Sequence, residues 1–209
     1  MAAEPPPTRP RVYRQTTRAQ LAEETRRRIA VAFFECWRGR WFDEITLEEV
    51  AQRAQVSLRT VIRQFGGKEG LIGAVVTYVA PEVDTHRIVR PGDVDAAIER
   101  LFENYESDGD STIRILAQEE RLPGLAALLA RARAGHRSTI DANFAPWLDP
   151  LASAKRQQAL DALVVVMDVY AWKLLRRDMG HSEKDAKAMM LGLIRAVLAR
   201  FANAEPPMT

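Results

Sequence analysis

Apolar side chains recur at three- and four-residue steps along most of this chain, which is the spacing of one face of an α-helix. The first such stretch, 17–40, carries an apolar stripe that includes Ile29, Phe33 and Trp37. No segment keeps the strict alternation that is typical of a half-buried β-strand, and there is no internal repeat. The pattern therefore predicts an all-α fold of about nine helices.

Two short helices joined by a tight turn are predicted between Thr46 and Phe65. Thr46 and Glu49 have the spacing of a capping box, in which each side chain bonds a free backbone amide of the first turn. Ser57 is a second N-cap candidate, so a new helix begins there. Val61 and Phe65 lie four residues apart in it and are expected to pack inward, which leaves its other side chains exposed. This arrangement is a helix-turn-helix.

Further helices follow the motif. The expected order is a helix over 68–79, a linker over 81–92, a helix capped by Asp93 and broken at 107–110, a short helix around 113–117, a helix over 123–144, a helix over 159–175 and a final helix through Phe201. We expect an arm at 1–16, a helix-turn-helix domain at 17–66 and a helical domain at 67–205, which would serve ligand binding and dimerisation.

The last two predicted helices are apolar on more than one side. In the first, Val165, Val169 and Trp172 add a second apolar surface, and in the second, Ala188 and Gly192 belong to a strip of small residues spaced by four. A helix that is apolar on two sides must be buried on two sides. We therefore expect a homodimer through these helices, while burial of both inside a monomer is the alternative.

The segment from 46 to 71 resembles the DNA-binding module of the TetR/AcrR family of bacterial transcriptional regulators. The matching positions are Val56, Ser57, Thr60, Val61, Phe65, Lys68, Glu69 and Leu71, with Arg28, Ile29, Ala32, Phe33, Gly39, Phe42 and Thr46 upstream. Three positions depart from the family pattern: Gln55 and Arg59 replace common glycines, and Ile62 replaces a common tyrosine. That tyrosine would donate a hydrogen bond to a DNA phosphate, which isoleucine is unable to do.

The resemblance implies a dimeric repressor that binds a near-palindromic operator in double-stranded DNA and is released from it by a small molecule. Arg59 and Arg63 suit guanine edges, Leu58 suits a thymine methyl, and Gln64 suits a base or a phosphate. The groups expected to contact the DNA backbone are Thr46, Ser57, Thr60 and Lys68. A solvated surface role is the alternative for the arginines, and packing inside the motif is the alternative for Thr60.

The charge distribution agrees with this interpretation. Residues 1–80 carry 13 Lys and Arg against 9 Asp and Glu, whereas residues 81–209 carry 17 against 19. Basic residues release counterions from DNA, so the positive half of the chain is the half that holds the motif. The arm contains Arg9, Arg11 and Arg14 and is either a solubilising tail or a segment that touches DNA. The single cysteine, Cys36, suits a reducing cytoplasm and core packing more than redox sensing.

The C-terminal half holds enough aromatic surface to line a ligand cavity, although core packing would use the same residues. The candidate pocket residues are Phe102, Tyr105, Phe144, Trp147, Met167, Asp168, Tyr170 and Trp172. Asp168 lies in an apolar stretch and should be paired, either with an arginine or with a ligand.

Catalytic motifs are absent from the sequence. There is no phosphate-binding or dinucleotide-binding glycine loop and no nucleophile elbow, and His86, His136 and His181 lack the spacing of metal ligands. We expect neither an enzyme nor a bound cofactor or metal, and neither a signal peptide nor a membrane span, hence a cytoplasmic protein. A helical small-molecule enzyme or carrier, and a DNA-binding protein without an effector, are the alternatives.

Overall fold

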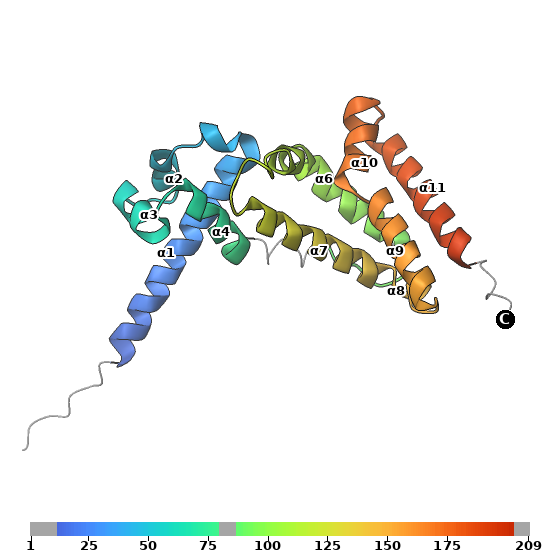
Figure 1. Cartoon of the computed structure of the whole chain (residues 1–209), viewed down its shortest axis with the longest axis horizontal. Helices are drawn as coiled ribbons and strands as arrows, with labels where there is room; N and C mark the ends of the chain where they lie inside the picture. Colours follow the sequence, from blue (N-terminus) through green and yellow to red (C-terminus); the bar gives the residue numbers. More distant parts are fainter. Residues whose placement is uncertain (1–11, 80–86, 203–209) are drawn as a thin grey trace, which may run out of the picture.

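The computed structural model describes residues 12–79 and 87–202, which fold into helices joined by short turns (Figure 1). The helices are α1 (Val12–Gly39), the 3₁₀ turn η1 (Phe42–Glu44), α2 (Leu47–Arg53), α3 (Leu58–Phe65), α4 (Lys68–Tyr78), α6 (Val94–Leu116), α7 (Leu125–Asn143), α8 (Ala145–Leu148), α9 (Ser153–Val166), α10 (Val169–Lys173), the π-helical turn η2 (Leu174–Asp178) and α11 (Glu183–Ala202). The all-α prediction is confirmed.

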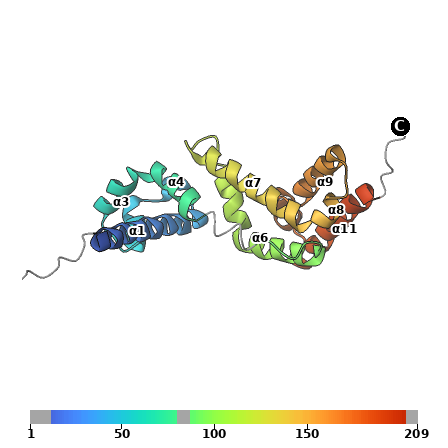
Figure 2. The same ribbon diagram turned by 90° about the horizontal axis from the view of Figure 1, so that it is seen from below.

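The molecule is elongated, with α1–α4 at one end and α8–α11 at the other (Figures 1 and 2). The buried apolar side chains form two cores, one toward each end of the molecule. The first joins α1–α4 to the end of α6 and the start of α7, where Ile115, Leu125 and Leu129 are buried against it. The second is built by α6–α11 around Phe102, Phe144 and other buried side chains. The first core therefore extends well beyond residue 66, where we expected the helix-turn-helix domain to end.

The helix α1 begins at Val12, several residues before the expected start at Thr17. Residues 1–11, which hold most of the expected basic arm, lie outside the described residues. So do residues 80–86, which include the first part of the linker expected over 81–92. Ile29, Phe33 and Trp37 of α1 are completely buried, and the Phe33 and Trp37 rings lie 5.3 Å apart between centroids. The apolar stripe predicted for this helix is thus buried in the first core.

The break that we expected at 107–110 is wrong, because these residues lie within the single helix α6. It runs without interruption through Gly109, and the glycine is buried. A β-carbon on Gly109 would lie 2.4 Å from Cζ3 of Trp172, far inside van der Waals contact. The glycine is therefore a packing residue that lets α6 approach α10, and the hydrophobic contact outweighs its low helix propensity.

The single helix expected over 159–175 is also wrong. The chain breaks after α9 at Met167, and Asp168 begins α10 as its N-cap, with the carboxylate accepting from the backbone N–H of Tyr170 at 2.9 Å. Asp168 thus lies at a helix start rather than inside a helix, where it satisfies an amide that has no partner within the helix. Its side chain forms no ion pair among the described residues.

The candidate DNA-binding face and ligand cavity

The two helices of the motif begin at the residues that the sequence indicates. The Thr46 hydroxyl oxygen accepts from the Glu49 backbone N–H at 3.2 Å, and the Ser57 hydroxyl oxygen accepts from the Thr60 N–H at 3.2 Å. The reciprocal half of the predicted capping box is not formed. The Glu49 carboxylate pairs instead with the Arg40 guanidinium, which holds the pKa of Glu49 below its usual value. This pair ties α2 to the end of α1.

The turn between the helices contains a residue in the left-handed region. Gln55 has a φ of 55°, which is a conformation that favours glycine. The backbone N–H of Val56 donates to Ala51 O at 2.9 Å across the turn. Gln55 therefore keeps the turn that the family glycine would make, at a cost in backbone strain.

One face of α3 packs inward and the other is open. Val61 is completely buried and Phe65 is partly buried in the first core, whereas Arg59, Ile62 and Arg63 are exposed. The helix thus presents two exposed cationic side chains, Arg59 and Arg63, next to the exposed apolar side chain of Ile62. Its start is half-buried because Leu58 packs against the first core. A surface helix with two arginines and this spacing is suited to the major groove of DNA.

Three other predicted contact residues already form hydrogen bonds within the domain. The Gln64 side-chain oxygen accepts from Arg26 Nε of α1 at 3.1 Å, and the Ser57 and Thr60 hydroxyls are hydrogen-bonded to each other at 2.9 Å. Both bonds lie at the edge of the exposed face. The bond between Arg26 and Gln64 links α3 to α1, whereas the bond between Ser57 and Thr60 lies within the first turn of α3. Either bond can coexist with a further contact because a hydroxyl or an amide has several hydrogen-bonding sites.

Lys68 points into the protein. Its ammonium donates to the backbone carbonyls of Phe42 at 2.8 Å and Ile45 at 2.9 Å, and it lies 4.6 Å from the centre of the Phe42 ring. It also donates to Asp43 O at 3.4 Å, so all three of its N–H groups are used, and a phosphate contact from Lys68 would require the loss of one of these bonds. Close by, a β-carbon on Gly70 would lie 2.0 Å from Phe65 O, so only glycine lets α4 follow α3 so tightly. These two residues set the angle at which α3 is presented.

Cys36 lies beneath the motif. It is buried, and its Sγ lies 3.7 Å from Glu49 Oε1. Burial, together with the Glu49 carboxylate, raises the pKa of the thiol, which lowers the fraction of reactive thiolate. This environment agrees with core packing.

Comparisons with known proteins agree with this geometry. Residues 34–75, which contain the end of α1 and α2–α4, match the model of the family described as bacterial regulatory proteins, tetR family. The segment that holds α2–α4 is thus similar to the DNA-binding part of TetR-family transcriptional regulators. That family consists of transcriptional regulators and not of enzymes. No curated protein matches the chain.

Two solved structures share the fold of this chain. A tetR-family transcriptional regulator from Streptomyces coelicolor is 16% identical, with 88% of this chain and 90% of that chain covered and a TM-score of 0.67. A proposed transcriptional regulator from Pseudomonas aeruginosa PAO1 is 13% identical, with 85% and 91% covered and a TM-score of 0.63. At these identities the likeness concerns the fold alone. None of the described helices has the length and apolar character needed to cross a bilayer.

A cavity of about 240 Å³ lies between the two cores. Its wall is mostly apolar and comes from both ends of the molecule. Phe34 and Trp37 come from α1, and Val75 and Val79 come from α4 and its C-cap. The other wall residues belong to α6, α7 and the start of α10, except Arg87, which precedes α6. The polar groups on the wall are Arg87, Tyr105, Thr112, Arg131, Arg133, His136, Asp168 and Tyr170. A ligand there would touch the helices that carry α3 as well as the C-terminal helices.

The structure brings three of the predicted pocket residues to this cavity, namely Tyr105, Asp168 and Tyr170. The Tyr105 hydroxyl donates to Met167 O at 3.0 Å, and burial raises its pKa above the usual value. The other predicted residues are elsewhere. Phe102, Phe144, Met167 and Trp172 are buried in the second core, and Trp147 is partly buried at its edge. Their apolar character is used for packing, so they do not line the cavity.

Sequence reasoning missed the half of the cavity that comes from the DNA-binding end. Phe34 and Trp37 belong to the first predicted helix, which the sequence does not connect with a pocket, and His136 is considered above only as a metal ligand. His136 is a polar side chain within α7 whose burial lowers its pKa to about 4, an effect that the nearby Arg87 guanidinium strengthens and the Asp168 carboxylate opposes. Such a buried histidine would be hard to find from sequence, because only the packing of α7 against α6 and α10 reveals it.

Proposed function

We propose that this protein is a dimeric, ligand-responsive repressor that acts in the cytoplasm, binds a near-palindromic operator and leaves it when a small molecule fills the cavity. The observation that carries the proposal is the exposed pair Arg59 and Arg63 on a short helix whose opposite face is fixed by Val61. Groups that read bases must be rigidly presented, and this helix is held by a cap at each end and by α4.

The readout follows from the chemistry of the exposed face. Arg59 and Arg63 would bond guanine edges in the major groove, and Leu58 would pack on a thymine methyl. Thr46, Ser57, Thr60 and Gln64 lie around this face and would position the helix on the phosphates. Ile62 is 45% exposed and supplies apolar contact where the family pattern has a phenol, so the affinity depends more strongly on the two arginines.

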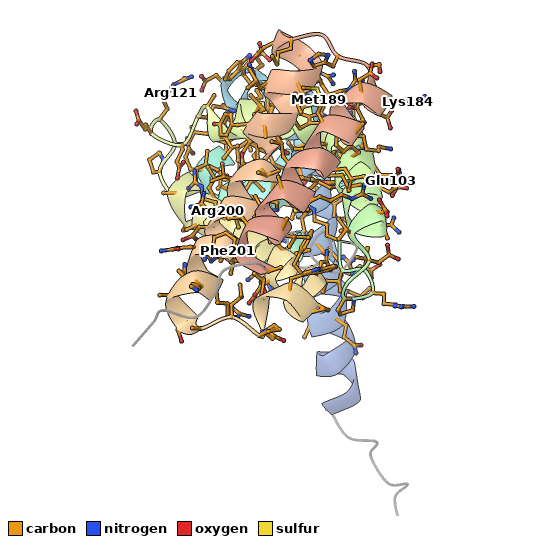
Figure 3. All side chains as sticks on the ribbon, turned by 90° about the vertical axis from the view of Figure 1, so that its right-hand side faces the viewer. Glu103, Arg121, Lys184, Met189, Arg200 and Phe201 are labelled. Carbon is orange, nitrogen blue, oxygen red and sulfur yellow. The ribbon has the colours of Figure 1, made fainter. Side chains whose placement is uncertain are left out.

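Residues 17–66 would form the DNA-binding domain, and residues 67–205 would form the domain for ligand binding and dimerisation. The dimer would form through α9 and α11. Large apolar side chains are exposed on these helices: Val165 is 70% exposed, Leu193 is 52% exposed and Met189 is 43% exposed. Gly192 has open space above its α-carbon, and Ala188 and Ala196 beside it are exposed. Figure 3 looks onto this face, on which the labelled Lys184, Met189, Arg200 and Phe201 mark the course of α11. An apolar face of this kind supports pairing with a second copy.

Ligand release requires that the two ends of the molecule be mechanically connected. The end of α1 is held by α6: the Ser111 hydroxyl and Arg114 Nη1 both donate to Arg38 O at 2.7 Å. Gln118, which is buried, accepts from the Phe42 backbone N–H at 3.0 Å. A ligand that displaces α6 or α7 relative to α1 would therefore move α3. It weakens DNA binding only as far as it prefers the displaced arrangement.

The proposal is tested by selecting bound duplexes from a random DNA pool with the full-length protein. We expect an enriched motif of two inverted halves, and an affinity for it that falls steeply as salt is raised. The same affinity for all sequences would contradict specific readout. A single asymmetric half-site would contradict the dimer, and sedimentation velocity on the free protein would test the dimer separately.

A further inference from the structure

The cavity between the two cores contains polar atoms that the protein itself leaves without partners. Trp37 is completely buried, and its indole Nε1 has no hydrogen-bond partner among the described residues. The same holds for Arg87 Nε and His136 Nε2. All three side chains line this one cavity. Buried polar groups nearly always have a hydrogen-bond partner. Three buried polar atoms without one on the same wall therefore point to a bound molecule that would supply the partner.

The orphaned atoms specify the chemistry of that partner. An indole nitrogen and a guanidinium nitrogen donate hydrogen bonds and accept none. His136 is neutral because its pKa is lowered to about 4, and it can offer its Nε2 as a donor in one tautomer. The complementary group on a ligand must therefore be an acceptor. An oxygen with several lone pairs satisfies more than one of these donors.

The charges on the wall favour an anion over a neutral acceptor. Arg133 is neutralised by Glu119, to which it donates two hydrogen bonds of 2.8 and 2.5 Å. Arg87 and Arg131 form no ion pair among the described residues, and Asp168 is the carboxylate on the wall. Arg87 bonds the side-chain oxygen of Asn104, which is neutral, so its charge is not compensated there. The wall thus keeps an excess of positive charge.

We propose that the effector is a predominantly apolar molecule that ends in a carboxylate or a comparable oxyanion. The inference rests on the proposed function, because it gives the chemical class of the molecule that fills the regulatory cavity. The anionic group lies against Arg87 and the Trp37 indole N–H, and the apolar body lies along Phe34, Val75 and the leucines of α7. The cavity volume of about 240 Å³ suits a small organic acid rather than a large multi-ring compound.

The placement of these groups explains how such a ligand would act on the DNA-binding end. Trp37 belongs to α1 and is packed against Phe33 and Phe42 in the first core. Arg87 precedes α6, and Asn143 of α7 donates to its backbone carbonyl at 3.2 Å. One anionic group that bonds both residues would fix the distance between α1 and the C-terminal helices.

The test compares molecules that share a skeleton and differ only in the end group. 4-Phenylbutyrate, 4-phenylbutanamide and 4-phenylbutylamine form one set, and decanoate, decanamide and decylamine form another. Binding to the full-length protein is measured by calorimetry and by the shift in melting temperature. We expect a carboxylate to bind about tenfold or more tightly than its amide and the amine not to bind. If no carboxylate binds, or if an amide or amine binds as tightly, the ligand class is wrong.

Arg87→Gln is the matching variant, and Arg100→Gln is its control. Arg100 is exposed on α6, pairs with Glu103 and does not line the cavity. We expect Arg87→Gln to abolish the preference for carboxylate over amide and Arg100→Gln to keep it. Preservation of the preference in Arg87→Gln would overturn the role of Arg87. Should that variant fail to fold, the three end groups on the wild-type protein still decide the ligand class.

DNA titration in the presence of the same compounds separates this inference from the proposed function. A carboxylate that binds and lowers operator affinity supports both. A carboxylate that binds and leaves operator affinity unchanged supports the ligand class and contradicts ligand release. An amide or amine that binds most tightly and releases the DNA contradicts the ligand class and supports the proposed function.

Discussion

The Trp172 indole ring lies directly on the backbone of Gly109. A β-carbon at Gly109 would lie 2.4 Å from Cζ3 and 2.5 Å from Cη2 of the ring. The indole Nε1 then donates to Glu106 Oε1 at 2.8 Å, one helical turn earlier on α6. This contact joins α6 to α10, and it forms one side of the second core.

Gly109→Ala should destabilise the protein because the added methyl group would force apart two closely packed helices. We expect a loss of about 1–3 kcal/mol in the free energy of unfolding, measured by urea denaturation. Gly73→Ala in α4 is the control, since its new methyl group would meet nothing within 4 Å. That control should be neutral or stabilising by up to about 1 kcal/mol. Equal effects of the two substitutions would contradict the packing role of Gly109.

Gln55→Gly should stabilise the helix-turn-helix, because glycine adopts the left-handed conformation without the steric cost borne by glutamine. After allowance for the larger entropy of glycine in the unfolded chain, we expect a gain of about 0.5–1 kcal/mol. Gln52→Gly, three residues earlier inside α2, makes the same chemical change in a helix and should cost about 1 kcal/mol. Thermal melts of both variants give the comparison, and a loss of stability in Gln55→Gly would contradict the left-handed turn.

Glu106 links α6 to η2 through Arg176, and its loss should be felt more than that of an exposed carboxylate. Arg176 Nε donates to Glu106 at 2.6 Å and Nη2 at 2.9 Å, and these bonds lower the pKa of Glu106. We expect Glu106→Gln to cost about 1–3 kcal/mol at pH 7. Glu103→Gln, in an exposed pair with Arg100, should cost less than about 1 kcal/mol. Chemical denaturation measures both values, and comparable costs would argue against a special role for the Glu106 pair.

His136 should make stability depend on pH in mild acid. Burial lowers its folded-state pKa to about 4, whereas the unfolded chain has the ordinary value near 6.5. Between these values the unfolded state binds more protons, so stability falls as pH decreases from about 6.5 to about 4. The full contribution is about 3 kcal/mol. The free energies of unfolding of wild type and His136→Gln, measured as a function of pH, should therefore converge or cross as the pH is lowered. If the two curves stay parallel, His136 is not buried in its neutral form.

The sequence was sufficient for the features that depend on local rules. Capping chemistry, which acts within three residues, predicts that helices begin at Thr46, Ser57 and Asp93. The sequence was insufficient where distant helices decide the outcome. Gly109 looked like a helix breaker because its role depends on Trp172, more than sixty residues later. The candidate pocket residues failed in the same way, since aromatic side chains suit a cavity wall and a packed core equally well.

The central claim is that Arg59 on the exposed face of α3 reads a base, and the most direct measurement compares operator and shuffled duplexes in one binding assay. Fluorescence anisotropy at fixed salt would give the ratio of the two affinities for wild type, Arg59→Ala and Arg100→Ala, where Arg100 is an exposed arginine on α6 that controls for lost charge. We predict that Arg59→Ala lowers this ratio by about 1–3 kcal/mol and that Arg100→Ala leaves it unchanged. An unchanged ratio in Arg59→Ala would contradict the account.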